Sequence, residues 1–478
     1  MSSHPLFIGG EWIAGSTRRS NVNPSDIEDV VGEYDDAAPS HVALAVDAAC
    51  AALPAWSRSS PQQRFDVLDF IGSEILARKD ELGLLLAREE GKILPEAIGE
   101  VARAGYVFKF FAGEALRIGG QALASVRPGI EVLTSREAVG VVGLITPWNF
   151  PIAIPAWKTA PALACGNSVI LKPAELTPGC AWALADIISR SGLPKGAFNL
   201  LMGGGEVGSA LVEQPRVAAI SFTGSIGVGS QIAQRCAASM KKFQLEMGGK
   251  NPLLVLDDAE LPVAVEAIVN GAFYSTGQRC TASSRILATE GIYPKLVAAL
   301  VERTRALRVG HALDATSQIG PVVDARQLGK DLDYMQIAKD EGGRILCGGE
   351  RISAARPGYY FSPALIANDD PQARLNREEV FGPVATIMRV GDYAQAIAVA
   401  NDSSMGLSAG ICTTSLKYAT RFRRDIEAGM VMVNAPTAGV DYHVPFGGIK
   451  GSSYGPREQG GLALEFYTRV KTHYLATH

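Results

Sequence analysis

AVGVVGLIT at residues 138–146 is the first of four short apolar stretches in the middle of the chain, and it is followed by SVILKP (168–173), FNLL (198–201) and AAISFTG (218–224). Helical patterns separate each stretch from the next. Short apolar strands that alternate with helices are typical of a parallel sheet covered on both faces. Such strands are buried on both sides, which explains why apolar residues run continuously along them. We therefore predict an α/β fold.

The flanking segments extend this pattern in both directions. Between residues 36 and 114, apolar residues recur at helical spacing, so this segment is predicted to form helices. A second alternation of apolar stretches and helical patterns begins near residue 248 and predicts a second α/β unit. The tail EFYTRVKTHYLAT (465–477) is strand-like and too apolar for a free end, so we expect it to pair with another element or another subunit.

Composition and charge exclude several classes of protein. The chain has 478 residues, of which 47% are hydrophobic and 20% charged, as in an ordinary globular protein of two or three domains. A net charge of −4 provides no basic patch, so no nucleic-acid partner is predicted. The most apolar segment, 139–171, is interrupted by prolines and polar residues, so no membrane span is expected.

The numbers and spacing of cysteine and histidine residues indicate the cellular compartment and whether the protein binds a metal. The seven cysteines form an odd set without a C-x-x-C pair, which suits reduced thiols better than a disulfide framework. The start, MSSHPLFIGGEW, lacks the basic and apolar runs of a secretion signal. The six histidines form no ligand pair, so no metal is predicted. We expect a cytoplasmic protein.

Cys280 is the first candidate for chemistry. It lies in STGQRCTASSR (275–285), where polar neighbours flank it instead of leucine or valine. Such company suggests a thiol that faces a cleft, where a nearby positive charge favours the thiolate. The alternative is a small core residue, which is the usual role of a free cysteine.

Glu246 is the second candidate. Strand alternation in FQLEMGG (243–249) places Gln244 and Glu246 on one face, and the two glycines then end the strand. Open α/β sheets hold their ligands at the carboxyl ends of strands, which is where this carboxylate lies. The alternative is a glutamate in a surface salt bridge.

Two turns complete the set. FTGSIGVG (222–229) joins a strand to a helix start, whose free N–H groups suit a phosphate, although it is not the G-x-G-x-x-G fingerprint. Asn149 lies in LITPWNFP (144–151), just beyond a buried strand, where its amide is a suitable donor to an oxyanion. The alternative for Asn149 is a turn residue that bonds its own backbone.

Several motifs in order resemble the NAD(P)⁺-dependent aldehyde dehydrogenase superfamily along nearly the whole chain. They are TPWNFP, WKTAPALACGNSVILKPAELTP, FTGSIGVG, LEMGGKNP, GQRC, EEVFGPV and PFGGIKGSSYG. The resemblance implies two Rossmann-like parallel-sheet domains plus a small β oligomerisation element. It places an NAD(P)-binding domain at 1–117 and 138–247, a catalytic domain at 248–450, and the oligomerisation element at 118–137 and 464–478. A homodimer or homotetramer is implied.

The same resemblance implies a mechanism. Cys280 attacks the aldehyde carbon to form a thiohemiacetal, whose oxyanion is held by the Asn149 side chain and the Cys280 N–H. Loss of hydride to nicotinamide leaves a thioester, and Glu246 activates the water that hydrolyses it. Lys158 is similar to a lysine that supports the active site. The presence of Glu246 favours release of a free acid over transfer to coenzyme A.

Cofactor residues also follow from the resemblance. Lys172 and Glu175 are expected at the adenosine ribose, and Glu379 and Phe381 at the nicotinamide ribose. The remaining expected contacts, around the pyrophosphate and along the cleft, are Thr146, Pro147, Trp148, Thr223, Gly224 and Ser225. Because a carboxylate repels a 2′-phosphate, Glu175 predicts a preference for NAD⁺, while Lys172 leaves room for some use of NADP⁺.

The substrate is predicted from the loop at 434–460 and from Arg279. Both look like enzymes that act on 2-oxoglutarate semialdehyde (2,5-dioxopentanoate), and Arg279 could pair with the distal carboxylate of that aldehyde. Succinic semialdehyde or a broad range of aldehydes is the alternative. The expected pocket walls are Phe150, Trp157 and Phe446. A cysteine esterase without redox chemistry and an idle structural protein are more remote readings.

Overall fold

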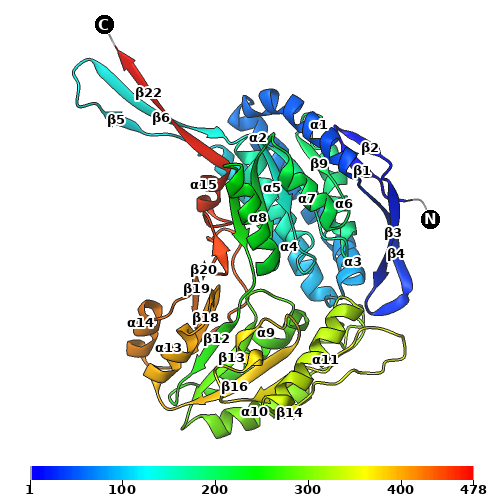
Figure 1. The fold of residues 1–478 in the computed structure, drawn as a ribbon, viewed down its shortest axis with the longest axis vertical. Coiled ribbons are helices and arrows are strands. Elements are labelled where there is room, and N and C mark those ends of the chain that lie inside the picture. Colours follow the sequence, from blue (N-terminus) through cyan, green and yellow to red (C-terminus); the bar gives the residue numbers. More distant parts are fainter. Residues whose placement is uncertain (1–2, 477–478) are drawn as a thin grey trace.

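The computed structural model describes residues 3–476 and contains two large sheets, one in each half of the molecule (Figure 1). The first has eight strands in the order β2 (Glu11–Ile13), β1 (Leu6–Ile8), β9 (Phe198–Leu200), β8 (Ser168–Lys172), β7 (Val141–Ile145), β10 (Val217–Thr223), β11 (Lys242–Glu246) and β21 (Ser453–Tyr454). The four predicted strands are β7 to β10, and they pair in parallel. The predicted α/β fold is confirmed.

Helices cover both faces of this sheet and bury its apolar strands in the largest core cluster of the protein. They are α1 (Pro39–Ser57), α2 (Pro61–Ala77), α3 (Lys79–Glu90), α4 (Leu94–Ala115), α5 (Ala153–Ala164), α6 (Pro178–Ser189), α7 (Gly205–Glu213), α8 (Ile226–Ala238), η2 (Gly461–Ala463) and α15 (Leu464–Tyr467). Helices α1 to α4 confirm the prediction for residues 36–114. The hairpin of β3 (Thr17–Asn23) and β4 (Asp26–Asp36) was not predicted.

The second sheet has seven strands and confirms the second α/β unit. Its order is β14 (Arg344–Cys347), β15 (Ala364–Ala367), β16 (Val384–Val390), β13 (Ser283–Thr289), β12 (Asn251–Val255), β18 (Ser408–Cys412) and β19 (Met430–Val433). The helices of this half are α9 (Leu261–Phe273), η1 (Tyr274–Gly277), α10 (Tyr293–Arg305), α11 (Ala325–Asp340), α12 (Arg374–Arg377), α13 (Tyr393–Asn401) and α14 (Leu416–Asp425). A short pair, β17 (Met405–Gly406) and β20 (Ile449–Lys450), lies beside it.

A third, three-stranded sheet projects away from the rest of the molecule (Figure 1). It consists of β22 (Thr468–Ala476), β6 (Ile130–Ala138) and β5 (Ala122–Ala124). The tail therefore pairs with another element, as predicted, although residue 477 lies outside the described residues. The predicted domain ranges that begin at residue 1 or end at residue 478 also extend beyond them. Those domain boundaries stay a prediction.

Parallel pairing brings the ends of four strands to one edge of the first sheet. Ile145 pairs with both Lys172 and Phe222, and Thr223 pairs with Glu246. Residues that immediately follow these strands must therefore meet along that edge, where α/β sheets hold their ligands. Stretches that are distant in sequence share this edge because of the pairing.

Three further findings concern the described part of the chain. No helix in residues 3–476 is long and apolar enough to cross a membrane. Among the same residues, no group of three histidine, cysteine, aspartate or glutamate side chains is placed to hold a metal ion. All seven cysteines carry free thiols.

Candidate active site

Cys280 follows a strained turn that leads from α9 into β13. Ser275, Thr276 and Gly277 have φ angles of 50°, 56° and 64°, which is a conformation that residues other than glycine rarely adopt. A Cβ atom on Gly277 would lie 2.2 Å from the carbonyl oxygen of Gly382, so only glycine fits there. The turn brings Cys280 to the wall of two cavities, of about 550 Å³ and about 320 Å³.

The surroundings of the Cys280 sulfur disfavour the thiolate in the free protein. Burial, followed by the charges of Glu379 and Glu246, raises the pKa of Cys280 to about 12. The backbone N–H groups of Cys280 and Thr281 act in the opposite direction. The sulfur therefore becomes reactive only when a cation, a base or an electrophile compensates for these effects.

Glu246 ends β11 and lies between two neighbouring strands. It pairs with Thr223 on one side and with Ser453 on the other, and the hydroxyl of Ser453 donates to its Oε2 at 2.5 Å. Glu246 is buried and lines the 550 Å³ cavity together with Cys280. Burial and the charge of Glu458 raise its pKa well above the usual range, while Ser453 and Lys158 partly oppose this.

A buried ion pair, Lys158–Glu458, lies close enough to Glu246 to affect its pKa. The ammonium group of Lys158, on α5, donates to Glu458 and, at 2.7 Å, to the hydroxyl of Ser221. The indole N–H of Trp157 donates to the other carboxylate oxygen of Glu458 at 2.5 Å. Lys158 and Glu458 are both almost fully buried, so each depends on the other for compensation of its charge.

Replacing Glu458 by glutamine is expected to destabilise the protein. It leaves the ammonium group of Lys158 buried without its counter-ion, at a cost of about 3–5 kcal/mol. The midpoint of thermal unfolding should fall by several degrees, and a second change, Lys158→Met, should recover part of the loss. The exposed pair Lys195–Glu11 provides the matched control, because Glu11→Gln should change the midpoint little. Equal effects of Glu458→Gln and Glu11→Gln would contradict this account.

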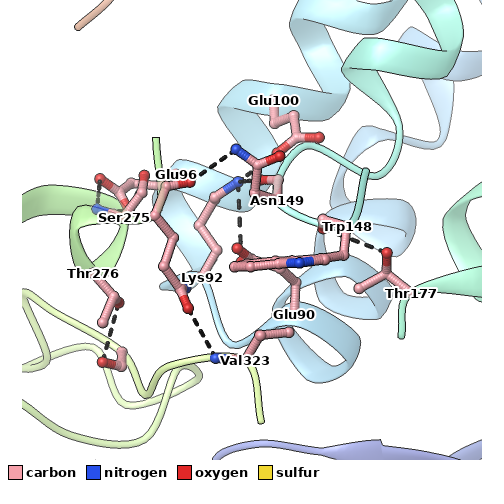
Figure 2. A network of polar contacts seen from close by, with 12 residues as sticks. Glu90, Lys92, Glu96, Glu100, Trp148, Asn149, Thr177, Ser275, Thr276 and Val323 are labelled. Atoms are coloured by element: carbon pink, nitrogen blue, oxygen red, sulfur yellow. Dashed lines mark hydrogen bonds and ion pairs between the residues drawn. The ribbon is translucent and has the colours of Figure 1, made fainter. Parts of the chain in front are cut away.

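Asn149 lies just beyond β7 and is held at both its side chain and its backbone. Its Nδ2 donates to the carbonyl oxygen of Gln278 at 2.9 Å, and its own carbonyl oxygen accepts from Lys92 Nζ at 2.8 Å. Figure 2 shows the ammonium group of Lys92 next to Asn149, Glu100 and Glu90. Its Nζ lies 2.6 Å from a carboxylate oxygen of Glu100 and 4.0 Å from one of Glu90. Asn149 and Cys280 line the same 320 Å³ cavity. The amide has a second N–H that remains available to a ligand.

The predicted cofactor residues line two adjoining cavities. The one of about 480 Å³ is lined, among others, by Thr146, Pro147, Trp148, Lys172, Glu175, Thr223, Gly224 and Ser225. Glu379 and Phe381 line the 320 Å³ cavity, which shares Pro147, Trp148 and the 223–225 turn with the first. Together they extend from Glu175 to Cys280 along the carboxyl edge of the first sheet.

These cavities fit a dinucleotide in their chemistry. The hydroxyls of Thr146 and Thr223 are buried without a hydrogen-bond partner, so each is available to a ligand. Helix α8 begins in the cavity wall with Ser225 as its N-cap, so its first N–H groups face the space where a pyrophosphate would lie. Glu379 accepts from the N–H of Gly249 at 3.0 Å, and Phe381 meets Trp148 edge to face.

The predicted substrate residues lie on the 550 Å³ cavity. Phe150, Trp157 and Phe446 form part of its wall, with the rings of Trp157 and Phe446 5.5 Å apart. Arg279 also lines the cavity, but its guanidinium group already pairs with Glu96 at 3.0 Å and with the hydroxyl of Ser275 at 2.8 Å. Glu96 in turn accepts from the N–H of Ser275, so this group braces the turn before Cys280.

Sequence reasoning missed several side chains of this site. They include Lys92, Glu96, Glu100, Arg103, Ser453 and Glu458. Glu458 and Ser453 lie in the 434–460 loop, which was assigned only to the substrate. The others lie on or near a predicted helix, where charged residues usually face solvent. Only their through-space partners distinguish them from surface charges.

The family model that matches this chain is the one described as the aldehyde dehydrogenase family, over residues 12–473. The chain belongs to the aldehyde dehydrogenase family. An alpha-ketoglutarate semialdehyde dehydrogenase of Haloferax volcanii is 42% identical over 474 residues, which cover 98% of this chain and 98% of that protein. An alpha-ketoglutaric semialdehyde dehydrogenase of Bacillus subtilis is 41% identical, with coverage of 98% and 96%.

A solved structure agrees with the fold of this aldehyde dehydrogenase. The crystal structure of betaine aldehyde dehydrogenase from Staphylococcus aureus in complex with NAD⁺ superposes with a TM-score of 0.97. It is 34% identical in sequence, and the match covers 99% of this chain and 95% of that one. This protein is therefore an oxidoreductase that oxidises an aldehyde with NAD(P)⁺ as the acceptor. Family membership favours this reading over the esterase and the idle structural protein.

Proposed function

We propose that Cys280 is the nucleophile of this aldehyde dehydrogenase. The observation that carries the proposal is that Cys280 lies where the two cavities meet, with Glu246 on one and Asn149 on the other. The sulfur attacks the aldehyde carbon, and its proton passes to a base in the cavity as the C–S bond forms. The thiohemiacetal oxyanion accepts hydrogen bonds from the free N–H of Asn149 and from the Cys280 backbone. Bound NAD(P)⁺ supplies the hydride acceptor.

Glu246 acts in the second half of the reaction. Its carboxylate takes a proton from water, which then attacks the thioester carbon and releases the acid and the Cys280 sulfur. A carboxyl with a raised pKa is a stronger base than an exposed one, which suits this task. Lys158 acts through its ion pair with Glu458, whose charge bears on Glu246. Lys158 is thus a positioning residue.

NAD⁺ is the preferred coenzyme in this proposal. Glu175 lines the far end of the 480 Å³ cavity, and its carboxylate lies 3.6 Å from Lys172 Nζ. Burial lowers the pKa of Lys172, while the charges of Glu175 and Glu206 oppose that effect. Two negative groups near one lysine disfavour a further phosphate and leave room for the hydroxyls of an unmodified ribose.

Replacing Glu175 by glutamine is expected to relax this preference. Removing one negative charge from a half-exposed position should raise kcat/KM for NADP⁺ relative to NAD⁺ by about tenfold. The measurement is the steady-state rate with each coenzyme at a fixed aldehyde concentration. Glu290, an exposed glutamate after β13, supplies the matched control Glu290→Gln, which should leave the ratio unchanged. An unchanged ratio in Glu175→Gln would remove Glu175 from coenzyme selection.

The proposed substrate is a short aldehyde with a distal carboxylate, such as 2-oxoglutarate semialdehyde (2,5-dioxopentanoate). Two relatives that match nearly the whole chain are named alpha-ketoglutarate and alpha-ketoglutaric semialdehyde dehydrogenase, after this substrate. The 550 Å³ cavity joins apolar walls to cationic side chains, which suits a chain with a charged end. Succinic semialdehyde is the second candidate because it has the same two functional groups at a shorter spacing.

A panel of aldehydes assayed with NAD⁺ and NADP⁺ tests the proposal. It should include 2-oxoglutarate semialdehyde, succinic semialdehyde, betaine aldehyde and neutral aldehydes of the same length, with reduced nicotinamide followed over time. We expect the highest kcat/KM for the carboxylated aldehydes. A higher value for betaine aldehyde or for neutral aldehydes would overturn the substrate assignment and leave the reaction type intact.

We also propose a homodimer or homotetramer in the cytoplasm. Side chains on β22 and β6, including Leu133, Val470, Tyr474 and Leu475, are exposed in the single chain. Apolar side chains on a projecting edge of this kind favour a partner subunit. Light scattering of the purified protein distinguishes monomer, dimer and tetramer.

A further inference from the structure

Three positively charged side chains among the described residues line the 550 Å³ cavity: Lys92, Arg103 and Arg279. Two of them already have a carboxylate partner. Lys92 lies 2.6 Å from Glu100, and Arg279 lies 3.0 Å from Glu96. A ligand anion at either position would have to displace a protein carboxylate or tolerate its repulsion.

Arg103, on α4, differs from the other two. Its Nη2 donates to the side-chain oxygen of Gln459 at 3.0 Å, and its Nε is buried without a hydrogen-bond partner. Within residues 3–476, no carboxylate lies within ion-pairing distance of its guanidinium group. The group lies over the ring of Trp157, with its carbon 5.7 Å from the ring centroid. Arg103 is thus a cation in a fixed position, with N–H groups that remain free to bind a ligand, on the wall of the cavity that contains Cys280.

We propose that Arg103 binds the distal carboxylate of the substrate and thereby sets the preference of this aldehyde dehydrogenase for acidic aldehydes. The inference rests on the proposed function and names the side chain that binds the charged end of the proposed substrate. A guanidinium group presents several N–H donors in a plane, which matches the two oxygens of a carboxylate. Gln459 and the Trp157 ring hold this plane in place, so little side-chain freedom is lost when a carboxylate binds.

The location of Arg103 also suits the other end of the substrate. Cys280 and Arg103 line the same cavity. A substrate anchored by its carboxylate at Arg103 extends along the apolar wall formed by Phe150, Trp157 and Phe446. Its aldehyde carbon then lies toward Cys280. Burial lowers the pKa of Arg103, and the charges of Glu100 and Asp441 only partly oppose this from beyond ion-pairing distance, so an anionic ligand in direct contact would stabilise the buried cation.

Arg279 has a different task in this arrangement. Its guanidinium group and Ser275 share the carboxylate of Glu96, and Ser275 belongs to the left-handed turn before Cys280. Arg279 therefore positions the nucleophile and is not the substrate anchor. A change at Arg279 should affect all aldehydes through kcat, whereas a change at Arg103 should affect only carboxylated ones through KM.

The experiment compares Arg103→Gln, Arg103→Lys and Arg279→Gln with the unmodified enzyme. Each is assayed with 2-oxoglutarate semialdehyde, succinic semialdehyde and a neutral aldehyde of equal length. In Arg103→Gln, KM for both semialdehydes should rise by about tenfold to a hundredfold, while the neutral aldehyde changes little. Arg103→Lys should recover part of the loss because it keeps the charge but not the planar donors. Thermal stabilisation by NAD⁺ should be retained in all three.

Each alternative outcome has a distinct meaning. If Arg103→Gln slows every aldehyde equally, or if Arg279→Gln produces the loss that is selective for acidic aldehydes, the inference is overturned. If the unmodified enzyme has no preference for acidic aldehydes, the proposed substrate fails first, and Arg103 has no preference to set. If the preference exists and persists in Arg103→Gln, the inference alone fails.

Discussion

Replacing Cys280 by alanine is expected to abolish aldehyde oxidation, with a fall in kcat of ~10⁴-fold or more. The thioester route requires a sulfur nucleophile, and among residues 3–476 no other cysteine lines the 550 Å³ or the 320 Å³ cavity. The measurement is the rate of nicotinamide reduction with a saturating aldehyde. The variant should still bind NAD⁺, because the 480 Å³ cavity does not include Cys280.

A matched cysteine provides the control for this prediction. Cys50 is also partly exposed but lies on α1, away from the cavities, so Cys50→Ala should retain the full rate. Alkylation of the free enzyme should label Cys280 slowly at neutral pH and faster as the pH rises toward the thiol pKa of about 12. Near-normal turnover by Cys280→Ala would contradict the assignment of Cys280 as the nucleophile.

Replacing Glu246 by glutamine is expected to stop the reaction at the thioester. Hydride transfer does not require the carboxylate in the proposed mechanism, whereas hydrolysis does, and loss of a general base costs ~10²–10⁴-fold. A burst of reduced nicotinamide equal to the number of active sites should precede a slow steady state. Intact-protein mass spectrometry should then detect the acylated enzyme.

The pH dependence of thioester hydrolysis provides a second test of the role of Glu246. Only the ionised carboxylate is a base, and burial together with Glu458 raises its pKa, so the rate of hydrolysis should increase with pH up to that raised pKa. The hydrogen bond from Ser453 lowers the pKa, so Ser453→Ala should move the increase to higher pH. Glu246→Gln should lose this dependence. A burst-free Glu246→Gln variant with the full pH profile would assign the base elsewhere.

The proposed active site lies between the two halves of the molecule. Glu246 and the cofactor cavity belong to the edge of the eight-stranded sheet, whereas Cys280 precedes β13 of the seven-stranded sheet. Several hydrogen bonds cross between them, such as that from Asn149 to the carbonyl oxygen of Gln278 and that from Ser275 to Glu96. The relative position of the two sheets therefore determines the distance between Cys280, the proposed nucleophile, and Asn149, its proposed oxyanion donor. Substitutions at Glu96 or Lys92 should act on catalysis through this alignment.

The sequence by itself determined the fold class and indicated the candidate catalytic groups. Short apolar stretches such as 141–145 and 168–172, each followed by a helical pattern, are typical of strands in a parallel sheet that is covered on both faces, so the pattern predicts this fold. Cys280, Glu246 and Asn149 lie in local motifs that are visible without coordinates. The strands β14 and β15 were not predicted because runs of only four residues are too short to be told apart from other apolar segments, and the β3 strand of the β3–β4 hairpin lacks an apolar pattern.

Only the tertiary structure decided which charges have partners. From the sequence, only Arg279 was predicted as a substrate anchor, whereas Arg103 is one charged residue of a predicted helix and Glu458 is one residue of a long loop. In the folded chain, Glu96 forms an ion pair with Arg279, and Glu458 forms one with Lys158. Arg103 instead donates to Gln459 and has no carboxylate partner in residues 3–476. The physical reason is that an ion pair depends on distance in space, and these partners lie far apart along the chain. Local patterns contain no information about such distances.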